Sequence, residues 1–150
     1  MKIVVSLLAA VFIAGLIAAA PTAAQLVRFG TVDVYVDTSA PLAAWQFELT
    51  EANGLMTVVG VENGQSNAFG DTPYYDLEAV SRGGADRIVV ADFSLADVSA
   101  LPRGTTRIAT VHVQLTGSAE PDYRVRLIAA GDAAGRAIEA AISLNSENGR

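Results

Sequence analysis

Cysteine is absent from this chain of 150 residues, and His112 is the only histidine. Without cysteine there is neither a disulfide bond nor a thiolate zinc site, so a folded domain depends on core packing alone. A lone histidine cannot form a histidine-rich metal site, and no serine stands in a G-x-S-x-G context. The sequence therefore gives no support to nucleophilic catalysis, and we expect a structural or surface role for His112.

Basic residues are also scarce. Lys2 is the only lysine, and the 16 acidic side chains outnumber the 10 basic ones, which gives a formal net charge of −6. Phosphate backbones are bound through basic patches that release counterions, so we expect no nucleic acid as a partner. An anionic membrane surface is disfavoured as a partner for the same reason.

The first 24 residues differ in character from the rest. After Lys2, the apolar run 3–20 is almost unbroken, and Pro21 introduces small residues that end at Ala24. This pattern predicts a signal peptide over 1–24, forming a signal helix that is cleaved after Ala24. A retained membrane anchor is the alternative, because the run approaches the length that a bilayer needs. We expect a secreted or periplasmic domain over 25–150, with no stable membrane insertion once the signal is cleaved.

Apolar and polar residues alternate with a period of two through most of the remaining chain. Trp45, Phe47 and Leu49 share one parity, which is typical of a strand with one face on a core, and we expect Trp45 in that core. Turns rich in Gly, Asn, Asp and Pro separate such segments. The pattern predicts an all-β fold, an antiparallel β-sandwich of the jelly-roll or immunoglobulin type, with about eight strands. The predicted strands are 31–37, 45–50, 55–61, 74–80, 87–95, 107–116, 123–129 and 137–144, before a frayed polar tail at 145–150.

Two of these strands carry a more specific prediction. In 55–61, Met56 and Val58 share one parity and Val59 and Val61 the other, which predicts a bulge or burial on both faces. In 107–116, alternate apolar residues from position 109 onward are predicted to point inward, and Ile108 is predicted to point outward.

Several segments together are similar to a known family. VDVYVD, WQFEL with a loop before LMTVVGVENG, RIVVADFS, GTTRIATVHVQLTG and the final YRVRLIAAGDAAGRAIEAAISL resemble the cohesin-like domains of the carbohydrate-binding-module superfamily. The resemblance covers nearly all of 25–150 and implies a jelly roll of about nine strands. It also implies a polysaccharide or a dockerin-like protein module as the partner. In contrast to scaffold cohesins, the sequence contains one such domain and no dockerin or linker.

The segment 63–86 is weakly patterned and rich in Gly, Asn and Asp, and loops of this length are often functional. Tyr74 and Tyr75 are candidates for stacking on sugar rings, with Asn67 and Asp71 placed to bond hydroxyl groups. Only one of two adjacent strand residues can face outward. Each tyrosine is therefore equally a candidate for a core position.

Acidic residues concentrate in or beside the same segment. Asp71, Asp76, Glu78 and Asp92, with Asp86 nearby, could supply the hard oxygen ligands that calcium prefers outside the cell. Their spacing matches no EF-hand, and a solvated acidic loop is the alternative. Calcium is therefore a possible cofactor, and no other is indicated.

Paired carboxylates are the one catalytic arrangement open to this sequence. Glu48 and Glu62 could flank a cleft on adjoining strands, as glycoside hydrolysis requires, although acids on exposed strand faces are usually only solvated. We expect no enzyme but a secreted, non-catalytic binding module that contacts an extracellular protein or a polysaccharide. The alternative is a structural subunit of an envelope layer or fibre, joined through sheet edges.

Overall fold

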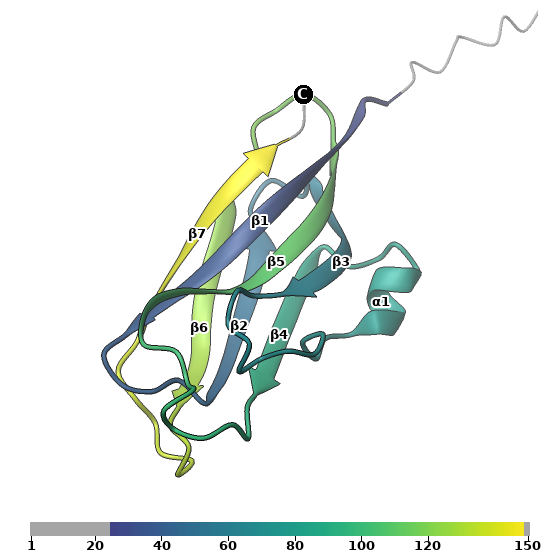
Figure 1. Ribbon diagram of the computed structural model, residues 1–150. Helices are drawn as coiled ribbons and strands as arrows, with labels where there is room; N and C mark the ends of the chain where they lie inside the picture. Colours follow the sequence, from purple (N-terminus) through teal and green to yellow (C-terminus); the bar gives the residue numbers. More distant parts are fainter. Residues whose placement is uncertain (1–24, 149–150) are drawn as a thin grey trace, which may run out of the picture.

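The computed structural model describes residues 25–148. The predicted signal peptide, 1–24, lies outside the described residues. The described chain forms seven strands and one short helix (Figure 1). Their bounds are β1 Val27–Thr38, β2 Ala44–Glu51, β3 Met56–Asn63, α1 Leu77–Ser81, β4 Arg87–Phe93, β5 Gly104–Thr116, β6 Tyr123–Gly131 and β7 Ala141–Asn148.

The strands build two sheets in which every pairing is antiparallel, which confirms the predicted all-β class. One sheet has the order β3-β5-β1-β7 and the other the order β4-β2-β6. Each strand lies in the opposite sheet from the strand before it, so every connection crosses from one layer to the other. In Figure 1 the four-stranded sheet lies in front of the three-stranded one.

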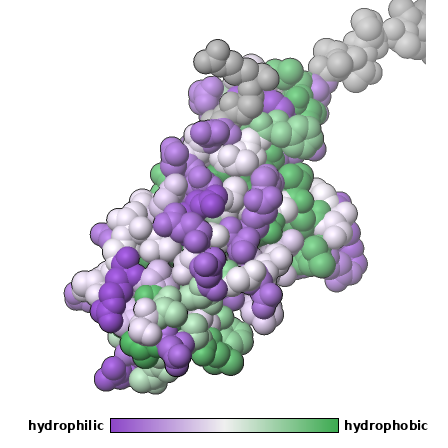
Figure 2. All heavy atoms as spheres, viewed as in Figure 1, coloured by the Kyte–Doolittle hydropathy of each residue, from purple (hydrophilic) through white to green (hydrophobic). Residues whose placement is uncertain are grey.

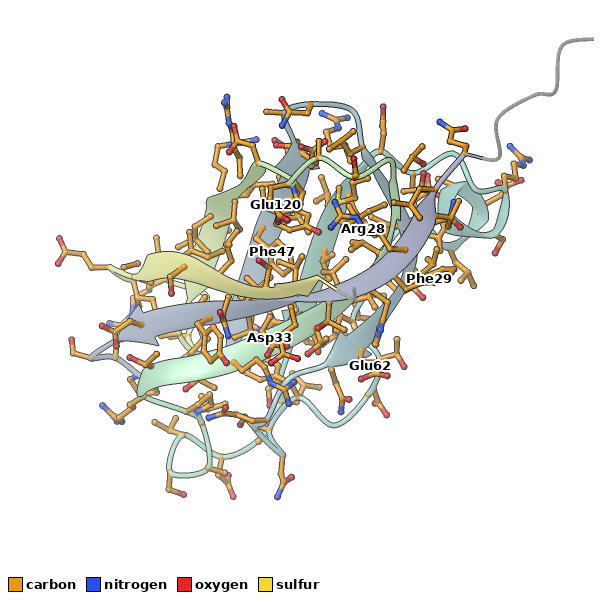
Figure 3. All side chains as sticks on the ribbon, turned by 90° about the horizontal axis from the view of Figure 1, so that it is seen from above. Arg28, Phe29, Asp33, Phe47, Glu62 and Glu120 are labelled. Carbon is orange, nitrogen blue, oxygen red and sulfur yellow. The ribbon has the colours of Figure 1, made fainter. Side chains whose placement is uncertain are left out.

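One hydrophobic cluster fills the space between the two sheets. The alternation in β2 points Trp45, Phe47 and Leu49 into it, and β1 contributes three valines from the other side. Trp45 is only 2 % exposed, which confirms its predicted core position, and its ring stacks on Phe47 at a centroid distance of 5.7 Å. Figure 3 shows Phe47 between the layers, with Asp33 and Glu62 on the outer side of the four-stranded sheet.

A β-bulge explains the change of parity predicted in the third strand. Val58 pairs with Val113 and Gly60 with His112, so Val59 has no partner and points to solvent. A second irregularity corrects a prediction in β5. Ile108, predicted to point outward, is buried, because an irregularity between Val34 and Tyr35 shifts the register there.

Two segments differ from their predicted structure. Residues 74–80 do not form a strand: Tyr74 makes a single bridge to Ala91, and α1 follows it. The fold therefore has seven strands over 25–148 instead of eight or nine. In addition, residues 145–148 are not a frayed tail, since they continue β7 and pair with β1. The last strand also begins at Ala141 and not at 137.

The outer face of the four-stranded sheet is largely polar (Figure 2). On it, Arg107 Nη1 lies 3.3 Å from Asp33 Oδ1 and donates a hydrogen bond to Thr110 Oγ1. Within 25–148, no helix is long and apolar enough to span a membrane.

Candidate functional site

A stacked pair of aromatic rings stands on the outer face of β4. Inward residues alternate with outward ones along this strand, and Phe93 points outward. Tyr74 exchanges two backbone hydrogen bonds with Ala91, of 2.8 and 3.0 Å, and residues directly opposite each other share a face of a sheet. The Tyr74 and Phe93 rings consequently lie parallel, at an interplanar angle of 6° and a centroid distance of 6.0 Å. Both are well exposed, at 64 % and 53 %.

A pocket of about 360 Å³ lies beside this pair. Its floor includes Phe69, which is buried and contacts Trp45 edge-on at a centroid distance of 6.0 Å, so the preceding loop is anchored in the core. Leu95, 92 % exposed, extends its rim. The lining residues are Ala68, Phe69, Gly70, Asp71, Tyr74, Asp92, Phe93, Ser94, Leu95 and Ala96.

Asp92 is the unusual member of this lining. It is only 8 % exposed because it takes an inward position in β4, directly opposite Trp45 of β2. Its Oδ1 accepts the Phe93 backbone N–H at 2.7 Å, but its Oδ2 is buried and has no hydrogen-bond partner among the described residues. Buried polar atoms are normally paired, so an unpaired carboxylate oxygen calls for an explanation.

The environment of Asp92 disfavours its charged form. Burial raises the pKa of its carboxyl group, and the negative charge of Asp71 raises it further. The hydrogen bond from the Phe93 N–H acts in the opposite direction but does not cancel these effects. Perturbed carboxyl groups in pockets are candidates for functional sites.

The structure separates the predicted ligand-binding residues. Tyr74 and Asp71 both line the pocket, whereas Tyr75 is half-buried against the core. Asn67 is exposed but does not line the pocket. Of the two tyrosines, Tyr74 is therefore the one available to a ligand.

The predicted calcium ligands do not form one cluster. Asp76 caps α1 by accepting the Ala79 N–H at 2.8 Å, and Glu78 pairs with Arg82 one turn along the helix. Only Asp71 and Asp92 share a site. In residues 25–148, no three His, Cys, Asp or Glu side chains lie close enough together to hold a metal ion.

The two glutamates considered for catalysis lie on different sheets. Glu48, on β2, forms ion pairs with Arg87 at 3.1 Å and Arg126 at 3.3 Å. Glu62, on β3 of the other sheet, lies 3.1 Å from His112 Nε2, which forms no hydrogen bond among the described residues. The alternative that Glu48 and Glu62 flank one cleft is wrong, since β2 and β3 lie in different sheets.

Phe93 and Phe69 line the pocket but were not predicted as site residues from the sequence. Phe93 reads as one more residue of the strand 87–95, and its outward parity was the only available signal. Its role depends on Tyr74, which comes alongside only through the bridge to Ala91. Phe69 lies in a segment with no periodic pattern, so nothing in the sequence indicates that it is buried.

No known family model, curated protein or solved structure matches this chain. The resemblance to cohesin-like domains therefore stays a prediction from sequence.

Proposed function

We propose that this chain is an exported, non-catalytic binding module with a jelly-roll β-sandwich of the cohesin-like kind. In this proposal it contacts an extracellular polysaccharide or protein with the outer side of β4 and with the segment 68–74, which precedes α1. The observation that carries the proposal is the exposed Tyr74–Phe93 pair above a pocket of about 360 Å³. We call this place the Tyr74–Phe93 site.

The exposed apolar surface at this site favours binding of a ligand. Two large aromatic rings and Leu95 stand in water at one place, and their burial by a ligand would be favourable by roughly 25 cal/mol for each Å² of apolar surface covered. Aromatic residues are also enriched in the side chains that dominate binding energies. The neighbouring loop is anchored through Phe69, so little ordering of the backbone would oppose binding.

The rival proposal is a structural subunit joined through sheet edges. β3 is an edge strand of the four-stranded sheet, but the bulge at Val59 interrupts it. Bulges are a common means by which edge strands avoid pairing with other chains. Size-exclusion chromatography with light scattering separates the two proposals, since a monomer at high concentration contradicts the structural subunit.

The binding proposal is tested by comparing three forms of the purified protein. A panel of soluble polysaccharides is scored by affinity electrophoresis, and extracellular proteins are scored by quantitative pull-down. The Tyr74→Ala/Phe93→Ala double variant should lose the ligand that the wild type retains. Phe29→Ala is the matched control, because Phe29 is 60 % exposed and lies near the start of β1, in the four-stranded sheet (Figure 3).

Two results would contradict the proposal. One is that the wild type retains no polysaccharide and no protein. The other is that the double variant retains the same ligand as the wild type, which would place binding elsewhere on the molecule.

A further inference from the structure

The Tyr74–Phe93 site holds two carboxylates that no cation within residues 25–148 neutralises. Asp71 and Asp92 line the pocket, and no arginine does so in the described part of the chain. Every arginine in 25–148 has a partner elsewhere. Arg28 bonds the Gly117 carbonyl, Arg82 pairs with Glu78, Arg87 and Arg126 with Glu48, Arg103 bonds the Ser39 carbonyl, and Arg107, Arg124 and Arg136 pair with Asp33, Asp122 and Asp132.

Burial makes this imbalance costly. Asp92 Oδ2 has given up water without gaining a donor, and Asp71 adds a second negative charge nearby. A buried carboxylate of this kind is stabilised by a hydrogen-bonded cation more than by any neutral group. A positively charged donor would stabilise this carboxylate more than the Nε1–H of Trp45, which lies opposite Asp92 and is itself unpaired among the described residues.

The walls of the pocket define what sort of cation fits. The faces of aromatic rings attract cations, and Tyr74, Phe93 and Phe69 all contribute rings. A guanidinium group is planar, stacks on aromatic faces and carries five donors, so one group could reach both carboxylates. The apolar rim formed by Leu95 and the ring edges suits the aliphatic stem of such a side chain.

We propose that the Tyr74–Phe93 site binds an arginine side chain presented by a protein partner, with its guanidinium group between Asp71 and Asp92 and its stem along Phe93. This inference rests on the proposed binding function and assigns the ligand to the protein class. A calcium ion fits less well, because it takes six to eight oxygen ligands and the side chains that line the pocket offer two carboxylates and the hydroxyl groups of Tyr74 and Ser94.

The test uses two peptides that differ only in charge. Acetyl-Gly-Arg-Gly-amide and the same peptide with citrulline, the neutral isostere of arginine, are titrated into the purified protein by NMR. The arginine peptide should shift the amide signals of 68–74 and 91–96, and the citrulline peptide should bind at least about tenfold more weakly.

Variants locate the charges that matter. Asp92→Asn should weaken binding of the arginine peptide by about tenfold or more, and Asp71→Asn, which changes a more exposed group, by up to about fivefold. Asp97→Asn is the matched control, since it removes the same charge from an exposed side chain just outside the pocket and should leave the affinity unchanged. Because Asp71 is exposed, its variant gives a second answer that does not depend on the packing around position 92.

Equal affinity for the two peptides, or no effect of either pocket variant, would overturn the inference. Shifts at the site caused by glucosamine oligomers or by calcium chloride alone, with no response to the arginine peptide, would also overturn it. These failures differ from failure of the proposed function. A polysaccharide lost by Tyr74→Ala/Phe93→Ala but unaffected by Asp92→Asn would keep the binding function and refute the arginine assignment.

Discussion

Glu51, at the end of β2, should be a main determinant of stability in this protein. Its buried carboxylate accepts three backbone N–H groups: Oε2 accepts from Leu55 at 2.7 Å, and Oε1 accepts from Asn53 at 3.0 Å and Asp122 at 2.9 Å. These bonds join the turn after β2 to the chain that enters β6. Burial alone would raise the pKa of Glu51, but the three N–H groups outweigh it and the pKa is lowered.

The number of lost bonds sets the expected cost of each substitution. Glu51→Ala leaves three N–H groups without an acceptor, at about 1–3 kcal/mol for each that stays buried. Water will reach some of them, so we expect a loss of about 2–4 kcal/mol in the free energy of unfolding. In Glu51→Gln the amide oxygen can keep the two bonds of Oε1, while the amide nitrogen faces the Leu55 N–H. The loss should then be about 1–2 kcal/mol.

Urea unfolding of the wild type and both variants, followed by Trp45 fluorescence, measures these losses. A group with a lowered pKa stabilises the fold above its unfolded value, here 4.5, and that stability is lost as pH falls through the folded pKa. The difference between wild type and Glu51→Gln should accordingly shrink in acid. Glu139→Gln, on an exposed side chain, is the control and should change stability by less than about 0.5 kcal/mol. Losses no larger than those of the control, or independent of pH, would refute this account of Glu51.

Three further substitutions test the packing and the pocket. Trp45→Ala should cost about 3–5 kcal/mol in urea unfolding, since it removes a large buried side chain; circular dichroism follows this variant, which has no tryptophan. Gly64→Ala should also destabilise, by about 1–3 kcal/mol, because a Cβ there would lie 2.1 Å from the Arg107 carbonyl oxygen; an unchanged midpoint would show that the loop can move aside. Asp92→Asn should raise the thermal midpoint near neutral pH. Because the pKa of Asp92 is raised, its ionisation destabilises the fold as pH rises through the unfolded value of 3.8 and the folded pKa. The gain in stability of Asp92→Asn over the wild type should therefore vanish in acid. A lower thermal midpoint of the variant near neutral pH would contradict this account.

Period-two alternation predicts strands in this chain because most of them have one face on the core and one in water. It locates β2 around Trp45 and indicates the bulge in β3 from the change of parity at Val59. It cannot give the partners of a strand, since β1 pairs with two strands that lie far along the chain. Residues 145–148 are polar and have a weak preference for strands, but they extend β7 because they pair with the edge of β1. Alternation in the sequence does not indicate this pairing.

The candidate site was predictable only in part. The composition and spacing of segment 63–86 predict an exposed tyrosine and Asp71 as candidate site residues. The strand predicted over 74–80 was wrong because Asp76 is a helix N-cap followed by Leu, Glu and Ala, a signal for a helix start that the aromatic residues obscured. The pairing of Tyr74 with Phe93 and the burial of Asp92 arise from tertiary contacts, which no local pattern contains.

The most direct test of the central claim is to map where a retained ligand touches the protein. Amide hydrogen exchange of the purified protein, with and without the polysaccharide or protein that it captures, gives that map. We predict that protection gathers in 68–74 and 91–96, around Tyr74 and Phe93. Protection confined to the outer face of the four-stranded sheet, around Arg107 and Thr110, would contradict the claim.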